Sequence, residues 1–304
     1  MTGAFPGGVL LLDKPIGWTS NAALGRARRL LGGVKAGHTG TLDPFASGLL
    51  PITVGEAGKF SRYSLEADKR YEATLKLGQT STTGDPEGEV SATGATLPSD
   101  PAKVERVLHS FLGEQDQVPP MHSALKQQGV PLYELARKGL EVPRMPRRIQ
   151  IHAIQLLDWS ERDTLRVDVR CSKGTYVRVL AEDIGHALGC GAYLTALRRT
   201  AVGVLSIGQA IDLEGFDRVA AEQRLHRLLP ASVMLSNLPR VDLDSRAARD
   251  LLDGKHPEVM DVNAVGEVQA WGPHEVFLGV AKVARGMAGT RLVPVRLMSS
   301  FVLP

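Results

Sequence analysis

The sequence predicts an α/β protein in which a large mixed, mainly antiparallel sheet is flanked by helices and followed by a small β-rich module. Apolar and polar side chains alternate over residues 69–77 and 165–171, which is the pattern of half-buried strands. Apolar residues recur at helical spacing over 20–31, 101–113 and 175–188. Near residue 239 the composition changes to short strands with one short helix. We therefore expect a large domain over 1–238 and a small module over 239–304.

The bulk composition is that of a folded protein. The chain has 304 residues, of which 43% are hydrophobic and 23% charged, and this argues against long disordered or fibrous segments. The net charge is only +3, so a polyanionic partner would be recognised through clustered basic residues. Cys171 and Cys190 are too few for a disulfide framework or a four-cysteine zinc site, and we expect core thiols. No apolar run approaches the ~20 residues that span a bilayer, so we expect a cytoplasmic protein without membrane contact.

The N-terminal part is predicted to contain a strand, a helix, a loop and a second strand. The apolar run 9–12 is followed by turn residues and indicates a buried strand. Ser20 is the expected N-cap of a helix that ends at the pair Gly32 and Gly33. The Gly- and Thr-rich stretch after this helix is expected to be a loop, and residues 49–54 resume as a strand.

The middle of the chain is predicted to add strands to the sheet and to contain one segment, 114–148, that lies outside it. After the strand 69–77, Asp100 and Pro101 open a helix that ends at Gly113. Residues 114–148 are rich in Pro and poor in apolar residues, so we expect an excursion from the sheet with one short helix near 132–138. A hairpin of strands 149–159 and 165–171 follows. A helix comes next, with Thr175 or Ser172 as its start signal and Gly189 as its end.

Asp43 is the first candidate for chemistry. It lies in GHTGTLDPFASGLL, and the segment from Lys14 to Leu42 before it contains five Lys or Arg side chains and no acidic residue. Taken alone, an Asp before Pro is a common turn residue. The glycines around it, however, permit close approach of a ligand, and a carboxylate among apolar side chains needs a cationic partner to stay ionised.

KGTYVR supplies such a partner at a predicted switch from strand to helix. An Arg beside a carboxylate lowers its pKa and orients it through paired hydrogen bonds, which makes Arg178 a candidate to pair with Asp43. From helical spacing alone, Arg178 would be a surface residue. Tyr71 and Tyr176 add aromatic rings; a core role for Tyr71 is the simplest interpretation, but an extruded base would also stack on such a ring.

Other catalytic arrangements are not indicated. The chain has no GxxxxGK[ST] phosphate loop, no HExxH and no GxSxG. His38, His122 and His152 have no metal-binding spacing. We therefore expect neither a metal nor a cofactor.

Five segments in register carry a resemblance. DKPIGWTS, GHTGTLDPFASGLLPITVGEAGKF, KRYEATLKLGQTSTTGD, PPMHSALKQQG and CSKGTYVRVLAEDIGHALGCGAYLTALRR occur in this order between residues 9 and 210. Together they resemble the tRNA pseudouridine-55 synthase (TruB) family. The resemblance implies the pseudouridine synthase fold and isomerisation of uridine 55 in the T-loop of tRNA, with Asp43 as nucleophile. Whether the carboxylate attacks C1′ of the ribose or C6 of the uracil stays open.

The same resemblance implies roles for further residues. Tyr71 would pack on the target base and Arg178 would pair with Asp43, with Tyr176 in the same pocket wall. His38 would contact the substrate loop where the uridine has flipped out, and Lys14 and Pro15 would lie near the pocket. The excursion 114–148 would close over the RNA and contact phosphates; its candidates are Arg144, Arg147 and Arg148. His122 departs from the aromatic residue expected after PPM, which leaves its contact with substrate open.

By the same resemblance, the C-terminal module would occupy the place of the family's PUA-type RNA-binding domain. Its sequence predicts a short helix over 245–253 and three or four strands around GEVQAW, EVFLGVAKV and TRLVPVRLM. Both RNA binding and a purely structural cap fit this pattern. We expect a monomer that binds the T-arm of tRNA and needs no guide RNA. The alternatives are a guide-RNA-dependent relative and a catalytically silent RNA-binding protein.

Overall fold

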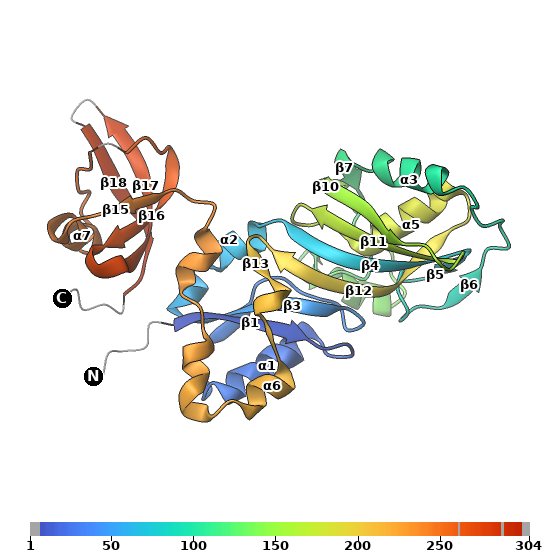
Figure 1. The fold of residues 1–304 in the computed structure, drawn as a ribbon, viewed down its shortest axis with the longest axis horizontal. Coiled ribbons are helices and arrows are strands. Elements are labelled where there is room, and N and C mark those ends of the chain that lie inside the picture. The colour runs from blue at the N-terminus through green and yellow to red at the C-terminus, as the bar shows by residue number, and fades with distance from the viewer. Residues whose placement is uncertain (1–6, 261, 287–288, 300–304) are drawn as a thin grey trace.

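Ten strands of the computed structural model form one large sheet, and a second sheet forms a separate lobe (Figure 1). The structure describes residues 7–260, 262–286 and 289–299. The first residues of the expected domain 1–238 and the last residues of the expected module 239–304 therefore lie outside the described residues. The large sheet has the order β14-β1-β3-β12-β4-β11-β10-β7, with β2 paired to β3 and β13 to β12. Only the pairs β1–β14 and β3–β12 are parallel, which confirms the predicted mixed, mainly antiparallel sheet.

The strands of this sheet come from the whole length of the large lobe. They are β1 (Gly7–Lys14), β2 (Ala36–His38), β3 (Ser47–Gly55), β4 (Lys69–Leu77), β7 (Gly113–Gln117), β10 (Arg147–Asp158), β11 (Thr164–Cys171), β12 (Ala192–Val202), β13 (Leu205–Ser206) and β14 (Ile211–Asp212). Two small hairpins lie outside it, β5 (Gln79–Ser81) with β6 (Val90–Ala92) and β8 (Lys126–Gln127) with β9 (Val130–Pro131).

Two groups of helices cover the two halves of the sheet. The helices α3 (Pro101–Ser110) and α5 (Val177–Leu188) share a buried apolar core with β4, β10, β11 and β12. The helices α1 (Ser20–Leu30) and α6 (Leu213–Arg218) share another with β1 and β3. Shorter helices are α2 (Ser61–Glu66) and α4 (Leu132–Arg137). No helix in the described ranges has the length and apolar character needed to cross a membrane.

Four predicted boundaries differ from the structure. The helix α3, expected to end at Gly113, ends at Ser110, and Gly113 begins β7. The N-cap of α1 is Thr19, whose Oγ1 accepts a hydrogen bond from the amide of Ala22, so the prediction of Ser20 was wrong by one residue. The N-cap of α5 is Tyr176 rather than Thr175 or Ser172, and it makes no side-chain cap. The excursion from the sheet is shorter than 114–148, because its first residues belong to β7 and its last two begin β10.

The C-terminal lobe packs firmly on the large one. It contains the sheet β15-β16-β17-β18 and the helix α7. Their bounds are β15 (Arg240–Asp242), α7 (Ser245–Leu252), β16 (Gly266–Gly272), β17 (Val276–Gly286) and β18 (Gly289–Leu297). The rings of Phe60 and Phe277 meet edge to face across the boundary, 5.4 Å between centroids. Gln269 Nε2 donates to the carbonyls of Leu235 and Leu238. The two lobes therefore share one apolar core.

Candidate active site

Asp43 lies on the loop between β2 and β3, and hydrogen bonds to Ser20 of α1 hold this loop in place. Ser20 Oγ donates to the Leu42 carbonyl at 3.0 Å and accepts from the Leu42 amide at 2.8 Å. The Ala46 amide donates to the Asp43 carbonyl and closes a turn through Pro44. Leu42 and Ala46 on either side are buried. The Asp43 side chain is left 37% exposed, so its carboxylate is accessible while its backbone is fixed.

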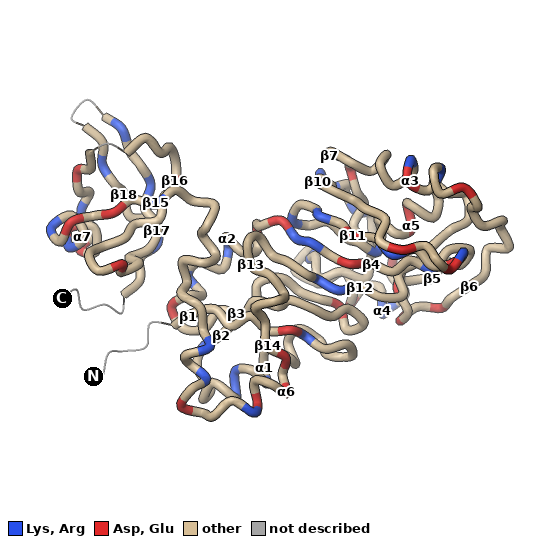
Figure 2. The backbone as a smooth tube through the Cα atoms, viewed as in Figure 1, with Lys and Arg blue, Asp and Glu red and all other residues tan. Residues whose placement is uncertain are grey.

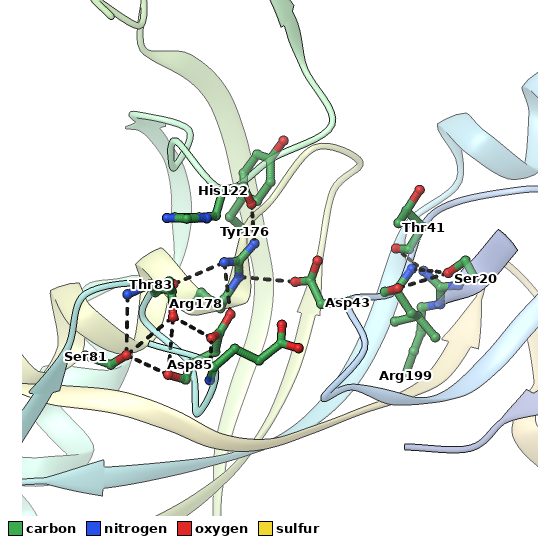
Figure 3. A network of polar contacts seen from close by, with 12 residues as sticks. Ser20, Thr41, Asp43, Ser81, Thr83, Asp85, His122, Tyr176, Arg178 and Arg199 are labelled. Carbon is green, nitrogen blue, oxygen red and sulfur yellow. Dashed lines mark hydrogen bonds and ion pairs between the residues drawn. The ribbon is translucent and has the colours of Figure 1, made fainter. Parts of the chain in front are cut away.

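Arg178 connects Asp43 to two other segments, residues 83–85 and His122 (Figure 3). Its Nε is 3.2 Å from Asp43 Oδ2, and its Nη1 is 3.0 Å from Asp85 Oδ2. Nη1 also donates to the Thr83 carbonyl, and Nη2 donates to the His122 carbonyl at 2.7 Å. The guanidinium is almost fully buried. The surface position expected from spacing was therefore wrong, and the predicted pairing of Arg178 with Asp43 is present in the structure.

Asp85 was not singled out by the sequence analysis. It follows the hairpin strand β5 within the segment KRYEATLKLGQTSTTGD, and its Oδ1 accepts hydrogen bonds from Thr83 Oγ1 and the Glu87 amide. Because Asp85 is buried beside Arg178, it compensates the guanidinium charge and fixes the orientation of the Arg178 side chain. Its acid-before-Pro context looks like an ordinary turn, and only the fold brings it under α5.

Burial sets the protonation of the central groups. It raises the pKa of the Asp43 carboxyl above its usual value, and the positive charges of Arg178 and Lys14 oppose the rise, while Asp85 adds to it. Lys14 is fully buried, with Nζ donating to the carbonyls of Pro15 and Trp18. Burial lowers the pKa of Lys14 to about 8, against the opposing effect of Asp43. Lys14 thus places a positive charge behind Asp43 and holds the loop that carries Pro15.

A pocket of about 420 Å³ opens in front of Asp43. Tyr71, at the start of β4, and Tyr176, at the start of α5, both line this pocket. Burial raises the pKa of both phenols, which keeps them protonated at neutral pH. Among the described residues, no cluster of three or more His, Cys, Asp or Glu side chains could hold a metal ion.

Two further cations line this pocket and were missed by sequence reasoning. Lys69 is buried, with Nζ donating to the carbonyls of Leu65 and Ala67 at 2.6 Å each, and burial lowers its pKa to about 8. Arg199 is 1% exposed and donates to the carbonyls of Gly40, in the Asp43 loop, and Leu49, in β3. Both stand in the segments quoted above, in KRY and ALRR, but both donate to backbone carbonyls, which leave no signal in the sequence.

Six predicted residues do not line the pocket of Asp43: Lys14 and Pro15, described above, and four that lie in other parts of the structure. His38 ends β2 and lines a separate hollow of about 670 Å³ together with Lys35, Lys59 and Arg296. Arg144 is half-buried and donates to the Pro119 carbonyl. The other two, Arg147 and Arg148, are exposed at the start of β10. In contrast, the structure brings Asp43, Tyr71, Tyr176 and Arg178 into one pocket.

Comparison with known proteins places this site in a family. Residues 28–177 match the model described as TruB family pseudouridylate synthase (N terminal domain). Residues 178–236 match the model described as tRNA pseudouridylate synthase B C-terminal domain. The chain is 52% identical over 294 residues to tRNA pseudouridine synthase B of Thiobacillus denitrificans, covering 96% of each chain. It is 50% identical to the protein of that name from Aromatoleum aromaticum, covering 96% of this chain and 93% of the relative.

Solved structures share the fold. A Cbf5-Nop10-Gar1 complex contains a chain with a TM-score of 0.75 and 24% identity, covering 97% of this chain and 86% of that one. An H/ACA RNP bound to a substrate RNA containing 2′-deoxyuridine contains one with a TM-score of 0.74, 23% identity and the same coverage. These confirm the predicted pseudouridine synthase fold. With the family models and the near-full-length relatives, they establish that the chain belongs to the TruB family of pseudouridylate synthases.

Proposed function

We propose that this enzyme converts uridine 55 in the T-loop of tRNA to pseudouridine, with Asp43 as the nucleophile. The class of reaction follows from the family and from relatives named tRNA pseudouridine synthase B. The position of the target uridine and the role of Asp43 are the finer parts of the proposal. They rest on the motif around Asp43 and on the pocket beside it.

The chemistry requires an ionised carboxylate that can reach an unstacked nucleoside. The bond between uracil N1 and ribose C1′ breaks, the base turns, and a bond between C5 and C1′ forms. The proton on C5 is lost and N1 gains one, so atoms balance without a co-reactant. Asp43 attacks either C1′, as in retaining glycoside hydrolysis, or C6 of the ring, and each route passes through a covalent intermediate.

The observation that carries the proposal is the contact of Asp43 with Arg178. An almost fully buried guanidinium lies 3.2 Å from a carboxylate that faces the pocket. Because Asp85 and two backbone carbonyls occupy the other donors of Arg178, the guanidinium is held in place and Asp43 is oriented before substrate arrives. The positive charge favours the ionised form against the effect of burial.

The remaining pocket suits a flipped base. Extruding a base from its stack costs a few kcal/mol, which aromatic contact and phosphate contacts must offset. Tyr71 and Tyr176 provide the rings. His122 presents its backbone carbonyl to Arg178, a contact that any residue could make, so the departure from the expected aromatic residue leaves the support of Arg178 intact.

RNA contacts are proposed outside the pocket. Figure 2 shows Lys and Arg distributed over both lobes rather than gathered in one block. Arg147 and Arg148 are exposed where the excursion rejoins the sheet, and Arg148 lies 3.3 Å from Glu114 and 3.5 Å from Asp116. We assign Arg144, Arg147 and Arg148 to phosphate contact, and His38, Lys14 and Pro15 to the surroundings of the target uridine.

We further propose that residues 1–238 form the catalytic domain and that the module 239–304 contacts the RNA as a PUA-type domain. The proposal includes a monomer that acts on the T-arm without a guide RNA. Its support is the 50–52% identity, over nearly the whole chain, to relatives named tRNA pseudouridine synthase B, whereas the chains of the Cbf5-Nop10-Gar1 and H/ACA RNP structures share only the fold. A cytoplasmic location accompanies this proposal.

The direct test is release of tritium from tRNA transcripts that carry uridine labelled at C5. We expect release of one tritium per tRNA and a pseudouridine at position 55, located by carbodiimide treatment and primer extension. A transcript with cytidine at position 55 serves as the matched control and should release none. Release at other uridines of the control transcript would contradict the assigned position.

A further inference from the structure

Arg199 stands where the two strands that frame the pocket meet. It belongs to β12, the strand between β3 and β4 in the large sheet. Its Cα partner in β4 is Tyr71, and its partner in β3 is Gly48, at the end of the Asp43 loop. The sequence analysis gave Arg199 no role, and the mechanism above does not use it.

The guanidinium of Arg199 binds the beginning of the Asp43 loop and the strand β3 that follows the loop. Nη2 donates to the Gly40 carbonyl at 3.0 Å and Nη1 contacts the Thr41 carbonyl at 3.5 Å, before Asp43. Nε donates to the Leu49 carbonyl at 2.7 Å, after Asp43. A buried cation is costly unless its donors are satisfied, and the three carbonyls that accept from Arg199 therefore constrain the loop strongly.

Close approach of the loop to Arg199 depends on Gly48. The residue has φ +106°, and a Cβ there would lie 2.3 Å from the Arg199 carbonyl oxygen and 2.7 Å from its amide nitrogen. Only glycine fits this conformation and this distance. The backbone of Arg199 thus packs closely against Gly48, just after the loop, while its side chain binds the Gly40 carbonyl near the beginning of the loop.

The charge of Arg199 also acts on the pocket. It opposes the effect of burial on the pKa of Tyr71, and it adds to the effect of burial in lowering the pKa of Lys69. Arg199 therefore adds positive charge to the part of the pocket that Tyr71 and Lys69 line.

We propose that Arg199 is a positioning residue that fixes the loop carrying Asp43 to the strand carrying Tyr71, so that nucleophile and stacking ring keep one relative placement. This rests on the proposed function of Asp43. Lysine cannot replace it, because a single ammonium cannot reach carbonyls at 40 and 49 at once with the forked geometry of a guanidinium.

The test combines kinetics with amide exchange in the full-length protein carrying Arg199→Lys. Misplacement of a reacting group by about 1 Å costs on the order of 100-fold in rate. We therefore expect kcat and the rate of covalent adduct formation with a 5-fluorouridine stem-loop to fall about 100-fold. The Kd for tRNA should stay within about threefold, because no phosphate contact is removed. Protection of the Leu42 and Ala46 amides against exchange should decrease.

Arg198→Lys is the matched control. Arg198 is the neighbouring strand residue; its guanidinium pairs with Asp13 and lies 3.4 Å from the Ser47 hydroxyl, contacts that a lysine can keep in part, and its side chain is partly exposed. Its variant should retain the wild-type kcat and loop protection. Wild-type kinetics or unchanged protection of Leu42 and Ala46 in Arg199→Lys would overturn the proposal, as would a loss confined to tRNA affinity.

A measurement on the wild type covers the case in which Arg199→Lys does not fold. In protein labelled with 15N-arginine, the guanidinium protons of Arg199 should exchange much more slowly than those of Arg198. Equal exchange would show that the side chain is not held and would end the proposal. Failure of the wild type to release tritium would instead remove the proposed function, while the exchange data would still report on the loop.

Discussion

At the residue scale, the pocket is surrounded by cations that are buried against backbone carbonyls. Lys14, Lys69 and Arg199 follow this pattern, and Arg178 adds carboxylates to it. Buried cations are costly unless their donors are satisfied, so their presence around one partly exposed carboxylate indicates a chemical role for them rather than a role in packing alone.

Asp43→Asn should abolish isomerisation with little effect on binding. The amide keeps the size of the side chain but cannot form the covalent intermediate, so we expect kcat to fall by at least about 10⁴-fold. The Kd for tRNA should stay within about threefold, because phosphate contacts dominate affinity. Tritium release and filter binding measure the two quantities, and turnover near the wild-type rate would remove Asp43 as nucleophile.

Arg178→Met should lower the rate and move its pH dependence. The active form of Asp43 is deprotonated, so the rate falls as pH drops through its pKa. Arg178 opposes the rise that burial causes in the pKa of Asp43, and without it the acid limb should shift to higher pH. We expect kcat to fall about 10²- to 10³-fold, as for loss of a preorganised charged donor.

Two measurements control for damage to the fold in this variant. Asp85 would be left buried without its partner, so the free energy of unfolding should fall by about 3–5 kcal/mol, and assays belong below the lowered Tm. Arg166→Met removes an exposed Arg of β11 and should leave the pH profile unchanged. An acid limb at the same pH in Arg178→Met and wild type would contradict the electrostatic role.

The sequence located Asp43, Tyr71, Tyr176 and Arg178 correctly in one pocket, but it could not find Asp85, Lys69 or Arg199. The first group stands out because polar residues interrupt apolar patterns within short motifs. The second group is defined by partners that the sequence does not reveal: Asp85 pairs with Arg178 far along the chain, Arg199 binds a carbonyl about 150 residues earlier, and Lys69 binds nearby backbone carbonyls. Backbone acceptors leave no compositional trace, so only the fold identifies such cations.

At the scale of elements, the periodicity of apolar residues and the Gly, Pro and capping residues at their ends predicted most of the strands and helices. The alternation in β4 and the Gly189 end of α5, with φ +82°, agree with expectation. The errors occur where tertiary contacts replace local signals. Tyr176 begins α5 without a side-chain cap because Gln117 of β7 accepts from its amide and donates to its carbonyl. The polar edge strand β7 looked like part of the excursion because it lacks an apolar face.

Charge reversal at the start of β10 tests the excursion as an RNA-binding element. The double variant Arg147→Glu and Arg148→Glu should weaken tRNA binding and reduce the slope of log K against log salt by about 2, if each residue contacts one phosphate. Arg162→Glu is the matched control, because Arg162 is exposed in the turn at the opposite end of β11. Titrations at several salt concentrations measure the slope, and an unchanged slope would exclude both residues from the RNA surface.

At the scale of the whole molecule, the C-terminal lobe and the large lobe share an apolar core. Phe60, Phe277 and Met298 pack together with Leu49 and Val9, so residues of both sheets exclude water from the same cluster. Such a boundary resembles the interior of one domain more than a contact between independent ones. The sequence predicted both sheets but not this junction, since an apolar side chain does not reveal which neighbour will cover it.

Phe277→Ala should therefore destabilise both lobes together. Removing a buried aromatic side chain costs about 3–5 kcal/mol. Calorimetry should show one transition at a lower temperature, since the lobes share the cluster that is damaged. Met260→Ala is the control, because Met260 is exposed and its truncation should change the free energy of unfolding by less than about 0.5 kcal/mol. Two separate transitions, with only the smaller one shifted, would show that the lobes unfold independently.

The shared cluster contains Leu49, whose carbonyl accepts from Arg199. A genetic screen for loss of activity should for this reason recover some substitutions in the C-terminal lobe at positions that do not contact RNA. Such alleles would be temperature-sensitive rather than null, and suppressor mutations would map beneath the nucleophile instead of on the tRNA-facing surface.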